Sequence, residues 1–250
     1  MDRREFRLTT PINATQTKNL RLDDIVYIDG TIFTIRDWSH QRIAQLLQEG
    51  KKEAIPFHLQ GLGVFHCGPI MTQKEGRGWE VVSAGPTSSS RFSSFIPVLL
   101  KGLHPGVMIG KGHLDEKIIG DLVQEKCVFL QAVGGCAALY ASQIQKVRNC
   151  YWPEFGMVDA VWEFEVKNFG PLSVEIDLKG NSSYRLLREK KLLKNLDRVY
   201  KSAGLPKHAD YIWWPKVSPG SKEAFDYATE VNKKSLPQKK KRSSKIRSAS

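Results

Sequence analysis

The stretch from residue 85 to residue 112 places the tightest limits on how this chain can fold. It opens with a glycine-proline pair and a hydroxyl-rich run that ends at Arg91. An apolar segment at 95–100 then predicts a helix, and the apolar run at 107–109 predicts a strand that ends in Gly110-Lys111-Gly112. Strands that alternate with helices, here and along the whole chain, indicate an α/β or α+β domain built in layers.

The polar residues of this stretch are of types that bind carboxylates. Arg91 offers a planar pair of donors that matches a carboxylate, Lys111 a mobile point charge, and Thr87 and Ser88 short hydroxyl hydrogen bonds. Such a set suits a pocket for a small molecule with more than one carboxylate. Plainer interpretations stay open: Thr87 or a neighbouring serine as the N-cap of the next helix, and the Gly-Lys-Gly segment as a surface turn.

The composition is that of an ordinary globular protein. The chain has 250 residues, 41% of them hydrophobic, which is enough for one sizeable core or two small ones. Its longest apolar region, residues 127–141, is interrupted by Gln131 and two glycines and is shorter than the ~20 residues that span a membrane. Because the charged start leads into no apolar signal segment, we expect a cytoplasmic protein without a membrane span.

Four cysteines are widely separated along the chain, at Cys67, Cys127, Cys136 and Cys150. This spacing argues against a zinc site built from neighbouring residues and against a disulfide framework, and it suits a reducing compartment. The spacing does not by itself exclude three of them converging on an iron-sulfur cluster. We interpret all four as small, mostly buried apolar residues.

The net charge of +12 is unevenly distributed. Residues 233–250 contain eight Lys or Arg and no Asp or Glu, so the first 232 residues carry only +4. We expect this low-complexity tail to be disordered. Its run from Gln238 to Arg242 is typical of a nuclear import signal and equally of a solvated tail. A tail of this kind also fits a non-catalytic protein that binds nucleic acid or an import receptor.

Two runs of β-branched residues, 23–28 and 31–35, flank Asp29-Gly30, a pair typical of a two-residue hairpin turn. Arg36 and Asp37 follow, where the second strand gives way to a helix. The apolar face of that helix carries Ile43, Leu46 and Leu47. Arg36 would either point into a cleft at the end of the sheet or pair with Asp37, and the sequence alone favours the ion pair.

The remaining elements alternate in type. Strands are predicted at residues 61–65, 79–83, 127–130, 158–166 and 172–176, with a polar turn at 73–78. Helices are predicted at 114–124, after the glycines at 134–135, and at 184–203, where the pattern is basic and amphipathic. His66, at the end of a predicted strand, is either a core group or a proton carrier, and we favour a structural or positioning role.

Several motifs, in the same order along the chain, resemble the β domain of the class I iron-sulfur hydro-lyases, the fumarases and L(+)-tartrate dehydratases. The run 85–91 followed by Gly110-Lys111-Gly112 carries the resemblance most strongly. Residues 8–12 and 65–70 are most similar to the separate β subunit of the tartrate dehydratases. The likeness spans residues 8–215, with further matching motifs at 36–40, 62–70, 170–177 and 180–181.

This resemblance implies a domain organisation and a reaction. Residues 1–215 would form a swivelling β/β/α domain that includes a C-terminal helix, followed by an extension at 216–232 and the disordered tail at 233–250. The implied reaction is the removal of water from a 2-hydroxydicarboxylate. Tartrate, giving oxaloacetate, is the first expected substrate, and malate/fumarate is the alternative.

The resemblance also implies roles for individual positions. Arg36, Arg91 and Lys111 would hold the substrate carboxylates, Ser88 would add a hydroxyl contact, and Thr87, with Lys111, would act in catalysis as the proton-abstracting side. Ser88 stands where the family usually has a second threonine, so the substrate carries over less firmly than the reaction class.

The cofactor implied by the resemblance lies on another chain. The open iron of a [4Fe-4S] cluster takes the leaving hydroxyl as a Lewis acid, and the family holds that cluster on an α subunit. No metal ligand is therefore expected here. The implied assembly is a hetero-oligomer of an iron-sulfur α subunit with this chain.

Overall fold

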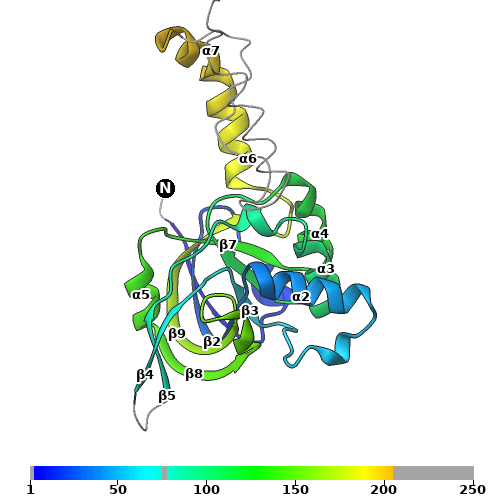
Figure 1. Ribbon diagram of the computed structural model, residues 1–250. Helices are drawn as coiled ribbons and strands as arrows, with labels where there is room; N and C mark the ends of the chain where they lie inside the picture. Colours follow the sequence, from blue (N-terminus) through cyan, green and yellow to red (C-terminus); the bar gives the residue numbers. More distant parts are fainter. Residues whose placement is uncertain (1–2, 75–77, 205–250) are drawn as a thin grey trace, which may run out of the picture. The chain divides into compact units, whose positions relative to one another are not determined.

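The structure is a computed structural model that describes residues 3–74 and 78–204 (Figure 1). The chain divides into two units, residues 1–197 and residues 198–250, and the sheet and candidate site lie in the first. The predicted extension at 216–232, the basic tail at 233–250 and its import-type run lie outside the described residues, as do the last eleven residues of the predicted 1–215 domain.

A seven-stranded mixed sheet forms the centre of the first unit, in the order β1-β2-β3-β6-β7-β9-β8. Its strands are β1 (Glu5–Thr9), β2 (Ile25–Thr34), β3 (Gly63–Phe65), β6 (Val107–Gly110), β7 (Val128–Ala132), β8 (Ile144–Tyr151) and β9 (Val161–Ile176). The first five strands in this order are parallel. Strand β9 runs antiparallel to both β7 and β2, so β2, β3, β6, β7 and β9 form a closed ring of paired strands.

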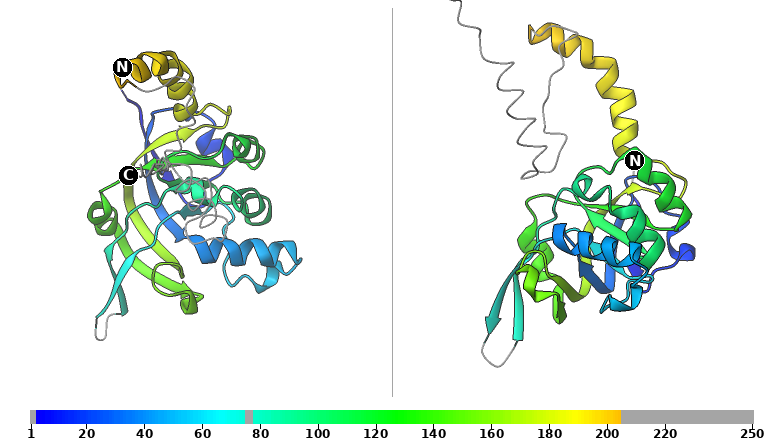
Figure 2. Two further views of the ribbon diagram at one scale, coloured as in Figure 1. Left: turned by 45° about the horizontal axis from the view of Figure 1, so that its top comes forward. Right: turned by 45° about the vertical axis from the view of Figure 1, so that its right-hand side comes forward.

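The described residues also form helices and a separate hairpin outside this ring. The helices are α1 (Ala14–Thr17), α2 (Asp37–Gln48), α3 (Ile96–Leu103), α4 (Ile119–Gln124), α5 (Ala137–Ser142), α6 (Ser183–Leu187) and α7 (Leu193–Ser202), with 3₁₀ turns at Lys52–Ala54, Ser89–Phe92, Glu116–Ile118 and Pro153–Phe155 and a π-helical turn at Arg188–Leu192. Strands β4 (Ile70–Lys74) and β5 (Gly78–Ser83) form the hairpin. Helices α2, α3 and α4 lie together on one side of the sheet, away from the hairpin and α5 (Figures 1 and 2).

Both faces of the parallel strands are buried, against different layers. Along β6, Val107 and Ile109 belong to one apolar cluster and Met108 to the other, as the alternation of a strand requires. The first cluster includes residues of β9, and the second includes residues of α2, α3 and α4. The parallel strands and β9 therefore form two layers of sheet, and α2, α3 and α4 form a third layer of helices. The predicted α+β class is confirmed, and burial on both faces explains why these strands read as continuous apolar runs.

The predicted hairpin at Asp29-Gly30 is wrong, because β2 runs through both residues without turning. Gly30 has φ +106°, and the pairing of β2 with β9 shifts register there. The positive φ that a turn would need is used for a bulge instead. Since β2 pairs with β1 on one side and β9 on the other, its long-range pairing outweighs the local turn preference.

Two further strand predictions need correction. The separate strands expected at 158–166 and 172–176 are one strand, β9, which is long because it pairs with β2, β7 and β8 along its length. Strands β1, β4 and β8 were not predicted. The central residues of β8, except Val147, are polar and exposed, and the strand lies at the sheet edge, so the sequence lacks an apolar run there. The helix expected at 114–124 is a 3₁₀ turn followed by α4, and the one at 184–203 contains the π-helical turn.

Tyr140 on α5 offers a test of how the ring of strands is held. Its buried hydroxyl accepts the Val133 N–H at 2.8 Å and donates to the Pro171 carbonyl at 3.1 Å, joining the end of β7 to β9. We expect Tyr140→Phe to lower the free energy of unfolding by about 1–3 kcal/mol, because two backbone groups lose their partner. Urea unfolding measures this change.

Tyr27→Phe is the matched control. The Tyr27 ring lies under the Arg7 guanidinium, and its hydroxyl has no hydrogen bond with the residues that the structure describes. Its removal should change the free energy of unfolding by less than about 0.5 kcal/mol. Equal losses in the two variants would contradict the assignment of the stabilisation to the Tyr140 hydrogen bonds.

Candidate functional site

The predicted site residues lie at the carboxyl ends of three parallel strands. Arg36 follows β2, His66 follows β3 and Lys111 follows β6. The hydroxyl-rich segment crosses these ends: the Thr87 N–H donates to the His66 carbonyl at 2.7 Å, and Ser88 pairs with Lys111 as an isolated parallel bridge. In open and in closed α/β sheets alike, ligands bind at the carboxyl ends of the parallel strands, so the location is one where a ligand site is expected.

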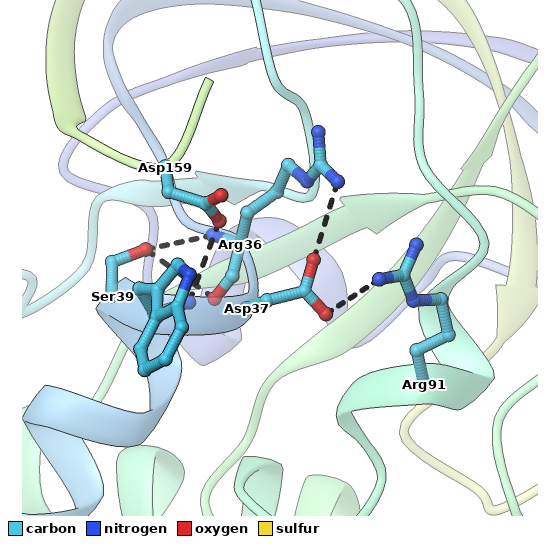
Figure 3. Close-up of polar contacts among 6 residues, drawn as sticks. Arg36, Asp37, Ser39, Arg91 and Asp159 are labelled. Carbon is cyan, nitrogen blue, oxygen red and sulfur yellow. Dashed lines mark hydrogen bonds and ion pairs between the residues drawn. The ribbon is translucent and has the colours of Figure 1, made fainter. Parts of the chain in front are cut away.

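Asp37 bridges the two arginines. Its Oδ2 lies 3.2 Å from Nη2 of Arg36, and its Oδ1 lies 2.7 Å from Nη2 of Arg91. Figure 3 shows both guanidinium groups turned toward this one carboxylate. Arg36 therefore makes the ion pair that the sequence alone favoured and also lies at the sheet end, as the resemblance implied.

The start of α2 fixes the position of Arg36. The Arg36 N–H donates to Ser39 Oγ at 2.8 Å, and the Trp38 N–H, in the first turn of α2, donates to Asp159 Oδ1 at 3.4 Å (Figure 3). Gly68 gives the side chain its room, because a Cβ there would lie 2.5 Å from Nη1 of Arg36. Helix capping and a missing Cβ thus hold the arginine at the strand end.

The other predicted residues have side-chain polar atoms without a partner among the described residues. The side chains of Thr87, Ser88 and Lys111 make no hydrogen bond or ion pair with the described residues. Ser88 stands at the N-cap position of the turn Ser89–Phe92, but its hydroxyl accepts no capping hydrogen bond. Capping is therefore not what these hydroxyls do in this structure. With Arg36, Arg91 and Lys111 against Asp37 and Asp159, the edge keeps a net positive charge that attracts anions.

A buried pair of histidines lies behind this edge. The ring of His66 is 5.1 Å from that of His40 on α2, and both contact Phe92, at 4.8 and 4.7 Å between ring centroids. Burial lowers the pKa of His66 to about 3, and burial together with His66 lowers the pKa of His40. Both rings are therefore neutral at ordinary pH. His40 was missed as a site neighbour, although its spacing to Ile43 places it on the buried face of α2.

The cysteines form no ligand set. Cys67 and Cys127 are buried, and burial raises the pKa of both thiols. Cys136 and Cys150 are half-buried against the same apolar cluster as Cys67, so the interpretation of the cysteines as packed apolar residues is confirmed. Within residues 3–74 and 78–204, no three His, Cys, Asp or Glu side chains are grouped as metal ligands would be, so these residues do not fit an iron-sulfur cluster.

None of the helices within residues 3–74 and 78–204 is both long and apolar enough to cross a bilayer.

Known proteins resemble most of this chain. Residues 1–187 match the family described as fumarase C-terminus. The chain is 39% identical over 191 residues to the L(+)-tartrate dehydratase subunit beta of Escherichia coli (strain K12), covering 74% of this chain and 88% of that protein. It is 40% identical over 180 residues to the putative L(+)-tartrate dehydratase subunit beta of Methanocaldococcus jannaschii, covering 72% and 91%.

A third relative is longer. The chain is 34% identical over 193 residues to a putative fumarate hydratase class I of Geobacillus stearothermophilus, covering 77% of this chain and 36% of that protein. These relatives are named as a tartrate dehydratase subunit and a fumarate hydratase, which are hydro-lyases and thus carbon-oxygen lyases. The chain belongs to the fumarase C-terminus family, and the resemblance to the β domain of these hydro-lyases is confirmed.

The buried histidines predict an acid-sensitive fold. In the unfolded chain each titrates near pH 6.5, whereas the folded pKa values are lower, about 3 for His66. The unfolded state therefore binds more protons between pH 6.5 and about 3, and the free energy of unfolding falls as the pH falls through that window. His66 should contribute a loss of about 2 kcal/mol between pH 6.5 and 5, at about 1.4 kcal/mol per pH unit, and His40 should add a loss in the same direction.

Urea unfolding at pH 7, 6 and 5 measures this loss. His40→Phe removes one of the two titrating groups and should flatten the pH dependence. His58→Gln, at an exposed position, should leave it unchanged. The same pH dependence in His40→Phe and the native chain would contradict the prediction.

Proposed function

We propose that this chain is the β subunit of a heteromeric hydro-lyase that removes water from a 2-hydroxydicarboxylate, first of all from L(+)-tartrate to give oxaloacetate, with malate/fumarate as the second candidate. One observation supports this proposal above the others: Arg36 and Arg91 already share a carboxylate, that of Asp37, and Lys111 follows β6 at the same edge of the sheet with no side-chain partner among the described residues. A carboxylate of the substrate would have the same two donors within reach.

In this proposal Arg36, Arg91 and Lys111 hold the two substrate carboxylates, and Ser88 adds a hydroxyl contact. A charge pair at about 4 Å contributes about 4 kcal/mol at an effective dielectric constant near 20, before desolvation is subtracted. Three such cations suffice to fix a dianion. They also stabilise the extra negative charge that develops on a carboxylate when the neighbouring carbon loses its proton.

We assign Thr87 as the base that takes this proton from the substrate carbon. A threonine hydroxyl is a very weak acid, so the cations at this edge would have to lower its pKa. Its backbone is fixed by the hydrogen bond to the His66 carbonyl, and its side chain is uncommitted among the described residues. The hydroxyl group of the substrate leaves on the opposite side, which the partner would form.

We assign that partner to an iron-sulfur α subunit holding the [4Fe-4S] cluster, which supplies the Lewis acid for the departing hydroxyl. Two observations support the assignment. The relatives of similar length are named as beta subunits, and the longer putative fumarate hydratase class I has most of its length outside the matching region. The four free thiols of this chain fit a reducing compartment, and we propose the cytoplasm.

The direct experiment is anaerobic co-expression of the full chain with an iron-sulfur α-type chain from the same source. The purified complex is assayed with L(+)-tartrate, L-malate and fumarate. Dehydration of tartrate with the highest kcat/KM supports the first substrate, and preference for malate/fumarate supports the second. A stable complex with an intact cluster that converts none of the three would refute the proposal.

The cationic clamp predicts large effects from single substitutions. Lys111→Ala and Arg91→Ala should each lower kcat/KM by about 10² or more, because each removes an ion pair with the substrate that contributes up to about 4 kcal/mol. Arg42→Ala is the control, since Arg42 is an exposed cation on α2 and outside the clamp. Near-normal turnover in Lys111→Ala or Arg91→Ala, or an equal loss in Arg42→Ala, would contradict the assigned roles.

Thr87 is tested by an isosteric pair. Thr87→Val keeps the shape and removes the hydroxyl, so kcat should fall by about 10² or more, the contribution typical of a general base. Thr87→Ser keeps the hydroxyl and should retain more activity. Steady-state kinetics of the reconstituted enzyme measure the kcat of both variants. If Thr87→Val keeps its kcat, the base is another group.

A further inference from the structure

His66, buried beneath the strand ends, contacts three parts of the candidate site: β6, Thr87 and Ser89. Its backbone N–H donates to the Ile109 carbonyl of β6 at 2.8 Å, and its own carbonyl accepts the Thr87 N–H at 2.7 Å. Its side-chain Nδ1 lies 2.8 Å from Ser89 Oγ. Both His66 and Ser89 are fully buried, so neither side chain reaches a ligand directly.

Ser89 makes two further hydrogen bonds, both with the backbone of Lys111. The Lys111 N–H donates to Ser89 Oγ at 3.2 Å, and the Ser89 N–H donates to the Lys111 carbonyl at 2.9 Å. We assign the single hydroxyl proton of Ser89 to His66 Nδ1, because this is the one acceptor in reach of it among the described residues. The imidazole proton then lies on Nε2, which has no hydrogen-bond partner among those residues. The result is a chain from Lys111 N–H through Ser89 O–H to His66 Nδ1, in which each bond strengthens the next.

The surroundings leave this chain little freedom. A Cβ at Gly110 would lie 1.8 Å from Ser89 Oγ and 3.1 Å from His66 Nδ1, so the backbone before Lys111 packs directly on the hydrogen bond. On the other side, Phe92 and His40 pack against the imidazole. The ring is therefore held in one place by packing, and it fixes Ser89 and the backbone of Lys111 through hydrogen bonds.

We propose that His66 and Ser89 are positioning residues of this site, which act on the substrate only through Lys111 and Thr87. The proposal rests on the proposed function, because that function assigns Lys111 to a substrate carboxylate and Thr87 to the proton. A displacement of the reacting groups by about 1 Å lowers the rate by up to about 10²-fold. Since the imidazole is neutral and buried, its role is to hold geometry, and it does not transfer a proton.

Two substitutions of His66 separate the hydrogen bond from the packing. His66→Phe keeps a ring and loses the acceptor, whereas His66→Asn keeps an acceptor near the position of Nδ1 and loses part of the ring. We expect the kcat of His66→Asn to be about 10-fold or more above that of His66→Phe, within the ~10² range of effects that misplaced groups have on rate. We expect the opposite order of melting temperatures, because His66→Phe keeps the packing of the ring. A purely structural role predicts that activity follows thermal stability, and that order would overturn the proposal.

Ser89 has a matched control in the same segment. Ser89→Ala should lower kcat by about 10- to 10²-fold. Ser93→Ala removes a hydroxyl that is also buried but has no hydrogen-bond partner within the described chain, and it should leave kcat unchanged. The pH–rate profile of His66→Asn should keep both limbs of the native profile. Loss of a limb would make His66 a proton carrier and would overturn its assignment as a positioning residue.

Amide hydrogen exchange of Lys111, followed by NMR in the full chain labelled with ¹⁵N-lysine, reads out the positioning without activity. Exchange should accelerate in Ser89→Ala and His66→Phe and stay slow in Ser93→Ala and His66→Asn. Unchanged exchange in Ser89→Ala would overturn the proposal even if activity fell. If the native complex converts none of the three dicarboxylates, the proposed function fails, and the exchange result alone decides whether His66 and Ser89 hold Lys111.

Discussion

The parallel pairing of β2, β3 and β6 is the interaction on which the site depends. Thr34 pairs with Phe65, and Phe65 pairs with Ile109, so the three strands end at one level. The residues that follow, Arg36 after β2 and Lys111 after β6, then emerge at the same edge. A one-residue slip of β6 would turn its buried side chains to the opposite faces and would move Lys111 away from Ser88 and Ser89. The apolar clusters on both faces of the sheet thus fix the register of the charged residues at its end.

Local sequence patterns predicted the elements of this sheet better than their connections. The apolar runs before His66 and Lys111 predicted β3 and β6 because both faces of these strands are buried, which leaves a clear signal. Asp29-Gly30 misled the prediction because its preference for positive φ fits a bulge as well as a turn. Only the pairing of β2 with β9, about 140 residues away, decides between the two. Interactions of that range leave no mark on a short window of sequence.

In the site, too, local sequence patterns predicted residues but not the long-range contacts between them. Thr87, Ser88, Arg91 and Lys111 were predicted from a segment of hydroxyl and cationic residues beside glycines, whereas Arg36 was assigned to the site only through the family resemblance. Their roles in the site stay predictions. The partners that hold them were not predicted. Asp37 was predicted as a neighbour of Arg36 but not as the link to Arg91, which lies 54 residues further along the chain. Ser89 was one of three serines in a row, and only the fold shows that it alone is fully buried and bonded to His66.

The strength of the Asp37 contacts bears on how a substrate would enter. Three cations at one edge repel one another, and Asp37 offsets part of that repulsion in the free protein. The side chains of Arg91 and Asp37 are 41% and 36% exposed, and ion pairs that water reaches contribute only about 0–1 kcal/mol. A substrate carboxylate would therefore exchange with Asp37 at small cost. Once a partner excludes water from the edge, the same arginines interact more strongly with the bound dianion, because the effective dielectric constant falls. In this scheme, the open strand ends favour exchange of ligands, and closure by the partner strengthens binding.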